Sequence, residues 1–136
     1  MGVKQRYQVI ERIDAGGMAE IFKGRALSLD GIERPVAIKR ILPSLSQNRK
    51  FLKMFIDEAR LSMRLSHANI VQVFDLGEID DTYFIAMEFV HGKDLLDLLA
   101  RCAEDDLKIP LKLTLHVVME VLKGLDFAHN AKDKFG

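Results

Sequence analysis

Lys39 is the residue whose type and position most directly suggest chemistry. It ends the run Val36–Lys39, whose residue types are typical of a short strand. Burying an ammonium in a half-buried strand costs several kcal/mol unless an anion accompanies it. That anion could be a carboxylate of the protein or a phosphate of a ligand, so the position of Lys39 predicts an anion-binding role.

Glu58 is the carboxylate best placed to meet Lys39. It lies beside the apolar face of a helix that the spacing of Phe51, Phe55, Ala59 and Ser62 predicts after the strand. A strand lysine and a glutamate near the inner face of that helix can pair, and the glutamate then holds the ammonium where phosphates arrive. Taken singly, each residue is equally well explained as an exposed surface charge. Together they favour an anion-binding pair.

A glycine-containing turn, Asp14–Ala19, precedes the Lys39 strand. Its small residues let backbone N–H groups approach phosphate oxygens without interference from Cβ atoms. Most such turns are only tight hairpins. No Gly-Lys-Ser/Thr follows, which excludes a Walker loop, and a second strand rather than a helix comes next, which excludes a Rossmann loop. The turn therefore indicates phosphate binding only together with Lys39.

The composition of the chain argues against several kinds of partner and site. The chain has 136 residues, with 20 basic and 20 acidic side chains, so it has no general attraction to nucleic acid and none is expected as a partner. The four histidines lack ligand spacing, so no metal site is expected. The single Cys102 fits a reducing compartment. No membrane segment or signal-peptide core is expected, and the predicted location is cytoplasmic.

The elements that must position these residues follow from residue pattern. Strands are expected over Tyr7–Ile13, Glu20–Leu27, Pro35–Ile41, Val71–Leu76 and Tyr83–Glu88. The first three form an antiparallel meander with a turn at Asp30–Gly31, and the last two are joined across Gly77 and Asp80–Asp81. The helix containing Glu58 begins after a cap region at Ser46–Asn48.

The last third of the chain is predicted to be helical. Asp94 caps a short leucine-rich helix that ends at Ala103, and Pro110 opens a long one. The long helix carries an apolar stripe made of Leu111, Leu115, Val118, Leu122, Leu125 and Ala128. Little else in the chain is available to cover that stripe, so self-association through residues 111–128 is expected.

In order and spacing, Ile13–Ile21, Val36–Lys39, Glu58 and Met87–Val90 resemble the small lobe of a protein kinase. Phe55–Ala59 with Leu65–Val71 is similar to the C-helix and its exit loop, and Gly124–His129 to the end of the first long helix of the large lobe. The sequence of the segment Gly16–Glu20 is similar to the loop sequence of bacterial serine/threonine kinases of the eukaryotic type.

The resemblance implies an α+β fold. A five-stranded antiparallel sheet with the C-helix would form the small lobe over residues 1–91, and residues 92–136 would begin the large lobe.

The resemblance also implies a site for ATP. Lys39 would hold the α- and β-phosphates, positioned by Glu58. The phosphate loop would be Asp14, Ala15, Gly16, Gly17, Met18 and Ala19. Ile13, Ile21 and Ala37 would cover the adenine, Met87 would be the gatekeeper, the backbone of Glu88 and Val90 would bind the adenine edge, and Asp94 would contact the ribose. The reaction implied is transfer of the γ-phosphoryl group of Mg-ATP to a Ser or Thr hydroxyl of a protein.

Two departures from the family pattern bear on activity. Asp14 and Ala19 replace the first and third glycines of the loop, and Asp14 puts a carboxylate near the phosphates. No His-Arg-Asp, Asp-Phe-Gly or Ala-Pro-Glu occurs in the sequence, so the catalytic base and the Mg²⁺ ligands are expected beyond Gly136. Two alternatives follow: part of a serine/threonine kinase that is inactive as this chain, or a non-catalytic kinase-like module that docks on a partner protein.

Overall fold

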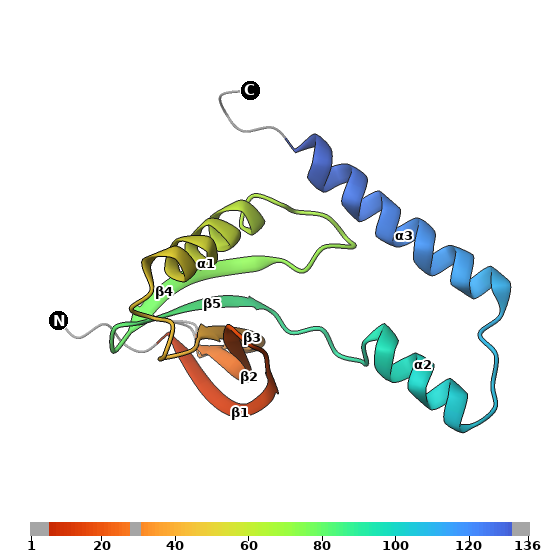
Figure 1. The fold of residues 1–136 in the computed structure, drawn as a ribbon, viewed down its shortest axis with the longest axis horizontal. Helices are drawn as coiled ribbons and strands as arrows, with labels where there is room; N and C mark the ends of the chain where they lie inside the picture. The colour runs from red at the N-terminus through yellow and green to blue at the C-terminus, as the bar shows by residue number, and fades with distance from the viewer. Residues whose placement is uncertain (1–5, 28–30, 132–136) are drawn as a thin grey trace. The chain divides into compact units, whose positions relative to one another are not determined.

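The computed structural model describes residues 6–27 and 31–131, which form five strands and three helices (Figure 1). By internal contacts the chain divides into two units. The first contains the residues up to Ser66 together with Val71–Phe89, and the second contains His67–Ile70 together with the residues from Val90 onward. The predicted lobes, 1–91 and 92–136, stay a prediction. In the described part of the chain, no helix is long and apolar enough to cross a membrane.

The first unit is built on one antiparallel sheet. Its strands are β1 (Tyr7–Ala15), β2 (Ala19–Leu27), β3 (Glu33–Ile41), β4 (Val73–Ile79) and β5 (Thr82–Glu88), in the order β1-β2-β3-β5-β4. The predicted meander of the first three strands and the five-stranded sheet are confirmed. Of the predicted Asp30–Gly31 turn, Asp30 lies outside the described residues.

The predicted role of Gly77 as part of a turn is wrong. Gly77 lies inside β4, where a Cβ atom would come within 2.5 Å of the Phe84 ring, so this glycine makes room for a core side chain. The turn is Asp80–Asp81 alone, and both residues have positive φ (50° and 56°), as a two-residue hairpin turn requires. The strand also begins at Val73 rather than Val71.

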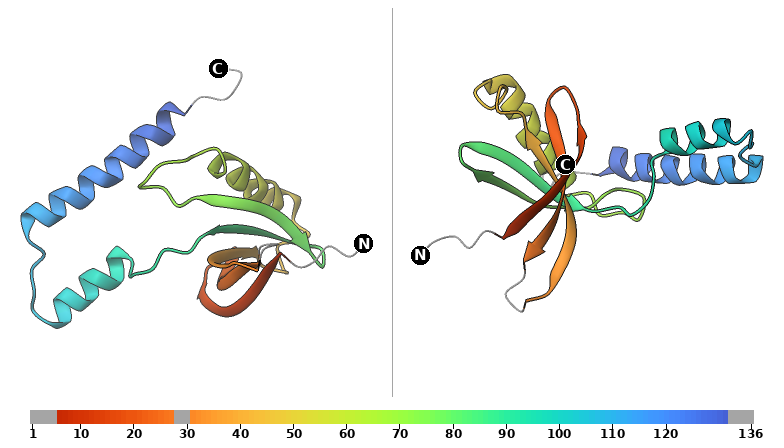
Figure 2. Two further views of the ribbon diagram at one scale, coloured as in Figure 1. Left: turned by 180° about the vertical axis from the view of Figure 1, so that it is seen from behind. Right: turned by 90° about the horizontal axis from the view of Figure 1, so that it is seen from below.

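Successive side chains along a strand point to opposite faces of the sheet, so the apolar side chains form two clusters, one on each face. On one face of the sheet lies α1 (Arg49–Ser62) (Figure 2). It buries Phe55 and Ala59 against Ile41, Val73 and Ile85. Asn48 caps this helix by accepting hydrogen bonds from the backbone N–H groups of Lys50 and Phe51, within the predicted cap region. The second cluster contains Val36, Ile38, Phe84 and Ala86.

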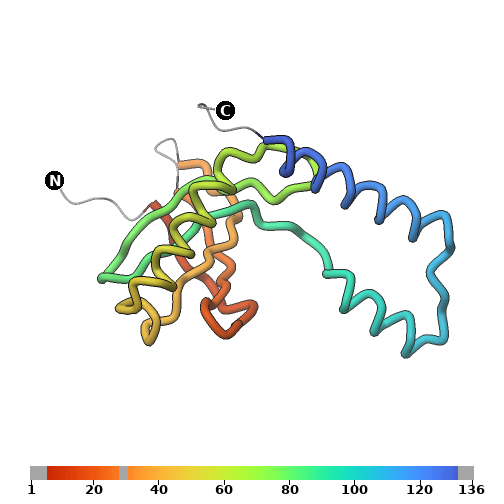
Figure 3. The backbone as a smooth tube through the Cα atoms, turned by 45° about the horizontal axis from the view of Figure 1, so that its top comes forward, coloured from red at the N-terminus to blue at the C-terminus, as the bar shows by residue number. Residues whose placement is uncertain are grey.

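The second unit consists of α2 (Leu95–Glu104), α3 (Leu111–Asn130) and the segment His67–Ile70. Asp94 caps α2 by accepting from the N–H of Asp97 at 2.7 Å, as predicted. The segment His67–Ile70 lies beside α3 (Figure 3), and the Asn69 side-chain amide donates to the backbone oxygen and the carboxylate of Glu120. Gly124 is buried beneath Asn69, so a side chain there would crowd the Asn69 carbonyl.

Candidate active site

A cavity of about 670 Å³ opens in the first unit between the Asp14–Ala19 loop, β3 and α1. It brings together eight of the predicted site residues, which come from three separate stretches of the chain: Asp14, Gly16, Gly17, Met18, Ala19, Ile21, Lys39 and Glu58. The loop, the strand lysine and the helix glutamate therefore share one space, as the resemblance implies.

The predicted ion pair between Lys39 and Glu58 is present. The Lys39 Nζ atom lies 2.7 Å from Glu58 Oε1, and the lysine side chain is 26% exposed against 54% for the glutamate. Lys39 is held in the middle of the sheet, opposite Ile21 on β2 and Ile85 on β5. The Lys39 Nζ also lies 5.9 Å from the centre of the Phe55 ring. An ammonium placed this way is held by a carboxylate and still lines the cavity.

The orientation of Glu58 follows from the burial of Phe55. Phe55 is 6% exposed in the core beneath α1, and Glu58 comes three residues later, on the neighbouring helical face. Burial of the Phe55 ring fixes the rotation of α1 about its axis. It therefore directs the Glu58 carboxylate toward β3 and not toward solvent on the far side of the helix.

The loop is closed by backbone hydrogen bonds. The N–H of Gly16 donates to the carbonyl of Ala19 at 2.9 Å, and the N–H of Leu42 donates to the carbonyl of Met18 at 3.0 Å. Neither Gly16 nor Gly17 needs to be glycine for the fold, because a Cβ atom on Gly16 would lie 3.6 Å from its nearest neighbour and one on Gly17 would meet nothing within 4 Å. The glycines leave open space at the loop, which suits close approach by a ligand.

Asp14 lines the cavity at the position where the family has a glycine. Its carboxylate Oδ1 accepts a hydrogen bond from the N–H of Ala15 at 2.8 Å. Among the described residues that line the cavity, Lys39 is the one cation and stands against the carboxylates of Asp14, Asp57 and Glu58. Asp57 is paired with Lys53 at 3.1 Å and Glu58 with Lys39.

The other predicted site residues lie outside the cavity lining. Ile13 is 49% exposed on β1, Ala15 is the last residue of that strand, and Ala37 is 8% exposed on β3. Met87 packs against the core cluster on the α1 side of the sheet, and the N–H of Glu88 donates to the carbonyl of Gln72 at 2.8 Å. Val90 and Asp94 belong to the second unit, where one carboxylate oxygen of Asp94 already caps α2.

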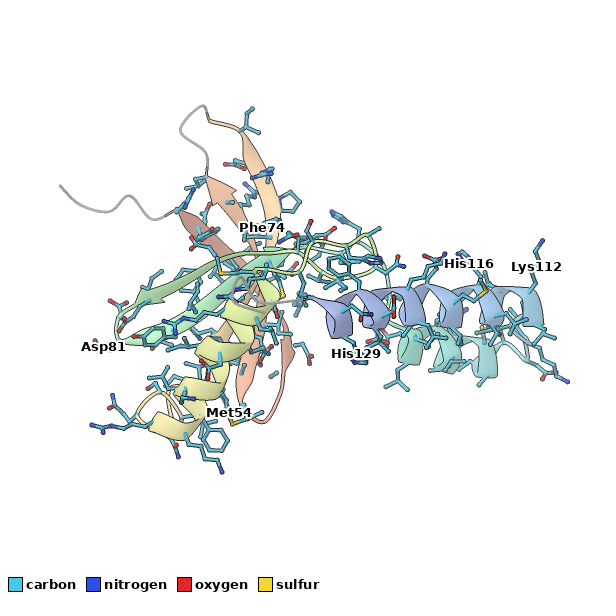
Figure 4. The ribbon with its side chains drawn as sticks, turned by 90° about the horizontal axis from the view of Figure 1, so that it is seen from above. Met54, Phe74, Asp81, Lys112, His116 and His129 are labelled. Carbon is cyan, nitrogen blue, oxygen red and sulfur yellow. The ribbon has the colours of Figure 1, made fainter. Side chains whose placement is uncertain are left out.

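The far wall of the cavity is formed by residues that the sequence analysis did not assign to it. They come from β3 and from one face of α1: Ile41, Phe51, Met54, Phe55, Asp57 and Leu61. Met54 is labelled on α1 in Figure 4 and is 50% exposed. The signal was present, since positions 51, 54, 58 and 61 recur at helical spacing beside the core-facing stripe.

The lysine end of the cavity offers groups that can bind a phosphate chain. A lysine held by a carboxylate beside open backbone suits a phosphate chain. By contrast, no group of three or more His, Cys, Asp or Glu side chains that could hold a metal ion is found in the described ranges, 6–27 and 31–131.

Comparison with known proteins gives one consistent family. The family described as "Protein kinase domain" matches residues 7–133. The chain is 42% identical over 130 residues to the tyrosine-protein kinase MasK of Myxococcus xanthus and 33% identical over 129 residues to the serine/threonine-protein kinase PrkC of Bacillus subtilis. These matches cover 96% and 93% of the chain but only 20% and 18% of the two relatives.

Solved structures give the same family. The kinase domain of PknI from Mycobacterium tuberculosis superimposes with a TM-score of 0.71 at 28% sequence identity, covering 92% of this chain and 48% of that one. The chain thus spans about half of a solved kinase domain and about a fifth of the length of the curated relatives.

Proposed function

Because the chain belongs to the protein kinase domain family, we propose that it is the ATP-binding part of a catalytic domain that phosphorylates protein hydroxyl groups. The observation that carries this proposal is the Lys39–Glu58 ion pair at the cavity beneath the glycine-containing loop. A unit charge at about 4 Å from a phosphate oxygen, in a partly screened site, is worth about 4 kcal/mol before desolvation.

Within this proposal, Lys39, Glu58 and the Asp14–Ala19 loop each have a role toward the phosphates. Lys39 binds the α- and β-phosphates, Glu58 holds the ammonium in place, and the backbone of the Asp14–Ala19 loop covers the phosphate chain. The adenine lies against apolar side chains of the strands, beside the backbone at the end of β5. The residues assigned to these contacts are Ile13, Ile21, Ala37, Met87 and Glu88.

Within the proposal, the chain binds ATP weakly and transfers no phosphoryl group. Its sequence contains none of the family's base-bearing or metal-binding motifs. Positioning by Lys39 and the loop supplies only part of the catalysis. Mg²⁺, which in the complete domain neutralises charge on the phosphates, is expected to add little to ATP binding here.

The acceptor proposed is a Ser or Thr hydroxyl of a protein. Serine/threonine-protein kinases recur among the relatives, with 33% identity for the Bacillus subtilis protein and 35% for pkn3 of Myxococcus xanthus. The relative at 42% identity is named a tyrosine-protein kinase, so tyrosine is the second candidate acceptor. A non-catalytic module that docks on a partner protein is the alternative from a different class.

Calorimetric titration with ATP, with and without Mg²⁺, tests the proposal on the chain itself. The wild-type chain should bind ATP weakly, and Lys39→Met should weaken binding about tenfold or more, because it removes the phosphate-facing charge. Lys112→Met, the same change on α3 in the second unit (Figure 4), is the matched control and should leave ATP affinity unchanged. No measurable ATP binding by the wild-type chain would overturn the proposal in favour of the docking module.

Phosphotransfer is the complementary assay. With Ser-, Thr- and Tyr-containing peptides, the chain should give no product above background. In a full-length protein, Lys39→Met should abolish transfer while leaving the fold intact, and the peptide that wild type labels identifies the acceptor. Micromolar, Mg²⁺-dependent affinity of the isolated chain would contradict the proposal that this chain lacks the metal ligands.

We also propose that the chain self-associates through residues 111–128 of α3. The apolar side chains along this helix are largely exposed, including Leu115 at 54% and Leu122 at 57%. Soluble monomers seldom leave more than a few hundred Å² of contiguous apolar surface bare. Burial at about 25 cal/mol per Å² makes association favourable by several kcal/mol.

A further inference from the structure

Glu20 bridges two strands on the face of the sheet opposite the cavity. Its Oε1 accepts from Arg12 Nη1 on β1 at 3.1 Å, and its Oε2 accepts from Arg40 Nη2 on β3 at 3.0 Å. Each carboxylate oxygen therefore binds one arginine. The Glu20 side chain is 15% exposed, against 60% and 44% for the two arginines, so the acceptor is the shielded member of the group.

These three side chains do not touch the cavity. Side chains alternate along β2, so Glu20 and Ile21 face opposite sides, and it is Ile21 that lines the cavity with Lys39. Arg40 lies with its guanidinium 4.7 Å from the centre of the Phe22 ring. It lines a different hollow, together with Ile38 and Phe84 of the second apolar cluster. Any influence of Glu20 on a bound phosphate must therefore pass through the position of the strands.

The bridge lies where the backbone pairing of the loop hairpin is irregular. Between Arg12 and Asp14 the register of β1 against β2 shifts, so the regular ladder is interrupted immediately before the loop. On the other side, Glu20 pairs directly with Arg40, and the next pair along is Ile21 with Lys39. The carboxylate thus joins the irregular end of β1 to the strand that carries the phosphate-facing lysine.

The bridge is charged under ordinary conditions. The hydrogen bond from Arg40, and next that from Arg12, hold the pKa of the Glu20 carboxyl below its usual value. Ionised donors and acceptors give shorter and stronger hydrogen bonds than neutral ones. A neutral amide of the same shape at this position would keep the packing and lose the charge.

We propose that Glu20 is a positioning residue of the phosphate-binding loop, which it holds at a fixed distance from Lys39 by bridging β1 and β3 with its two carboxylate oxygens. The effect on phosphate rests on the function proposed above. The effect on the order of the loop rests on the geometry alone, so the two can be measured separately.

The test compares Glu20→Gln with Glu33→Gln. Glu33 on β3 makes a similar cross-strand pair with Arg25 of β2, at 3.0 Å, toward the opposite end of the same two strands. It is the matched control for losing one carboxylate charge from the β2–β3 pair. Two quantities are measured for each variant: the exchange rate of the Gly16 amide by NMR, and the dissociation constant for ATP. The exchange rate of the buried Ile38 amide reports opening of the whole sheet.

Glu20→Gln should speed exchange of the Gly16 amide about three- to fivefold, because the bond from this amide to Ala19 opens more often, and should weaken ATP binding by a similar factor. Exchange of the Ile38 amide should stay at the wild-type rate. Glu33→Gln should change neither the Gly16 amide nor ATP binding by more than about 1.5-fold.

Unchanged Gly16 exchange in Glu20→Gln, or an equal effect from Glu33→Gln, would overturn the proposal. A wild-type chain that binds no ATP would count against the proposed function, and the exchange of the Gly16 amide would then decide on the positioning role by itself.

Discussion

The two units of the chain differ in what they bury. Among the described residues, every buried apolar side chain belongs to the first unit, where Ile41 is 1% exposed and Ala59 is fully buried. In the described part of the second unit, Gly124 is the one buried residue, while Leu96 is 76% and Leu111 is 73% exposed. The first unit is therefore held together by its own core, and the second presents apolar helices that need another surface.

This difference separates the roles of the two units. A cavity with an ordered lysine requires a rigid scaffold, and the core beneath α1 supplies one through Phe55 and Ile85. The second unit relies instead on polar contacts between Asn69 and Glu120 and on the close approach of Gly124. Substitutions in the first unit should therefore mainly lower the free energy of unfolding, whereas substitutions in the second unit should mainly change association.

The largest expected effect is on the free energy of unfolding of the first unit. Ile41→Ala should lower it by about 2–5 kcal/mol, because it removes a fully buried side chain next to Phe55. Leu113→Ala on α3, where the side chain is 49% exposed, should change stability by about 0.5 kcal/mol or less. Urea unfolding followed by circular dichroism measures both, and equal losses would contradict the contrast between the units.

A second prediction compares two glycines within the first unit. Gly24→Ala should destabilise by about 1–3 kcal/mol, because the new Cβ would lie 2.7 Å from the Gln8 carbonyl oxygen and 2.7 Å from Ile38 Cδ1. Gly17→Ala should leave stability within about 0.5 kcal/mol of wild type, because its Cβ would meet nothing. Thermal melting decides this, and a large loss for Gly17→Ala would show that the loop glycine serves the fold.

The third prediction concerns association through the second unit. Leu115→Lys and Leu122→Lys should each lower the association constant about tenfold or more, because a buried ammonium replaces an apolar contact. His116→Lys also adds a charge to α3 and should have little effect if the stripe is the contact surface (Figure 4). Analytical ultracentrifugation gives the measurement, and a wild-type chain that stays monomeric at high concentration would refute the proposal.

The smallest effect expected is a pH dependence of the contact between Asn69 and Glu120 in the second unit. The hydrogen bond from Lys123, and next that from Asn69, lower the pKa of Glu120 below its ordinary value of 4.5. A lowered carboxyl pKa stabilises the folded form fully above the unfolded value, and that contribution is lost as the pH falls through the folded value. The attachment of Asn69 to α3 should therefore weaken only below pH 4.5.

The side-chain amide signal of Asn69 in NMR spectra reports this titration. Glu120→Gln keeps an acceptor for the amide and should abolish the pH response. A response centred above pH 4.5 would contradict the stabilising role assigned to Lys123 and Asn69.

Much of the fold could be predicted because its strands and helices have clear periodicity. The alternation in Val36–Ile41 and the helical spacing of Phe55 and Ala59 follow from burial in this core. The role of Gly77 could not be predicted, because the sequence does not distinguish a glycine in a turn from a glycine inside a strand that makes room for an aromatic ring such as that of Phe84. Only the pairing of β4 with β5, which places Gly77 opposite Phe84, separates the two cases.

The candidate site was predicted in part for the same reason. Lys39 and Glu58 belong to elements with strong patterns, so their meeting could be predicted from the sequence. The wall made of Met54 and Leu61 lies on a face of α1 that is neither core nor obviously polar, and the bridge by Glu20 depends on strand register. The helical spacing of Met54 and Leu61 could be seen in the sequence, but the cavity that they line and the bridge by Glu20 depend on contacts between distant residues.

The most direct test of the central claim is the ratio of ATP to adenosine affinity, measured by titration of the wild-type chain and two variants. Lys39, held in place by Glu58, is proposed to bind phosphate and not adenine, so wild type should prefer ATP by about tenfold or more. Lys39→Met should bring the ratio close to one, and Glu58→Gln should give an intermediate value, while the affinity for adenosine stays the same. A ratio that neither substitution changes would contradict the assignment of the Lys39–Glu58 pair as the phosphate-binding group.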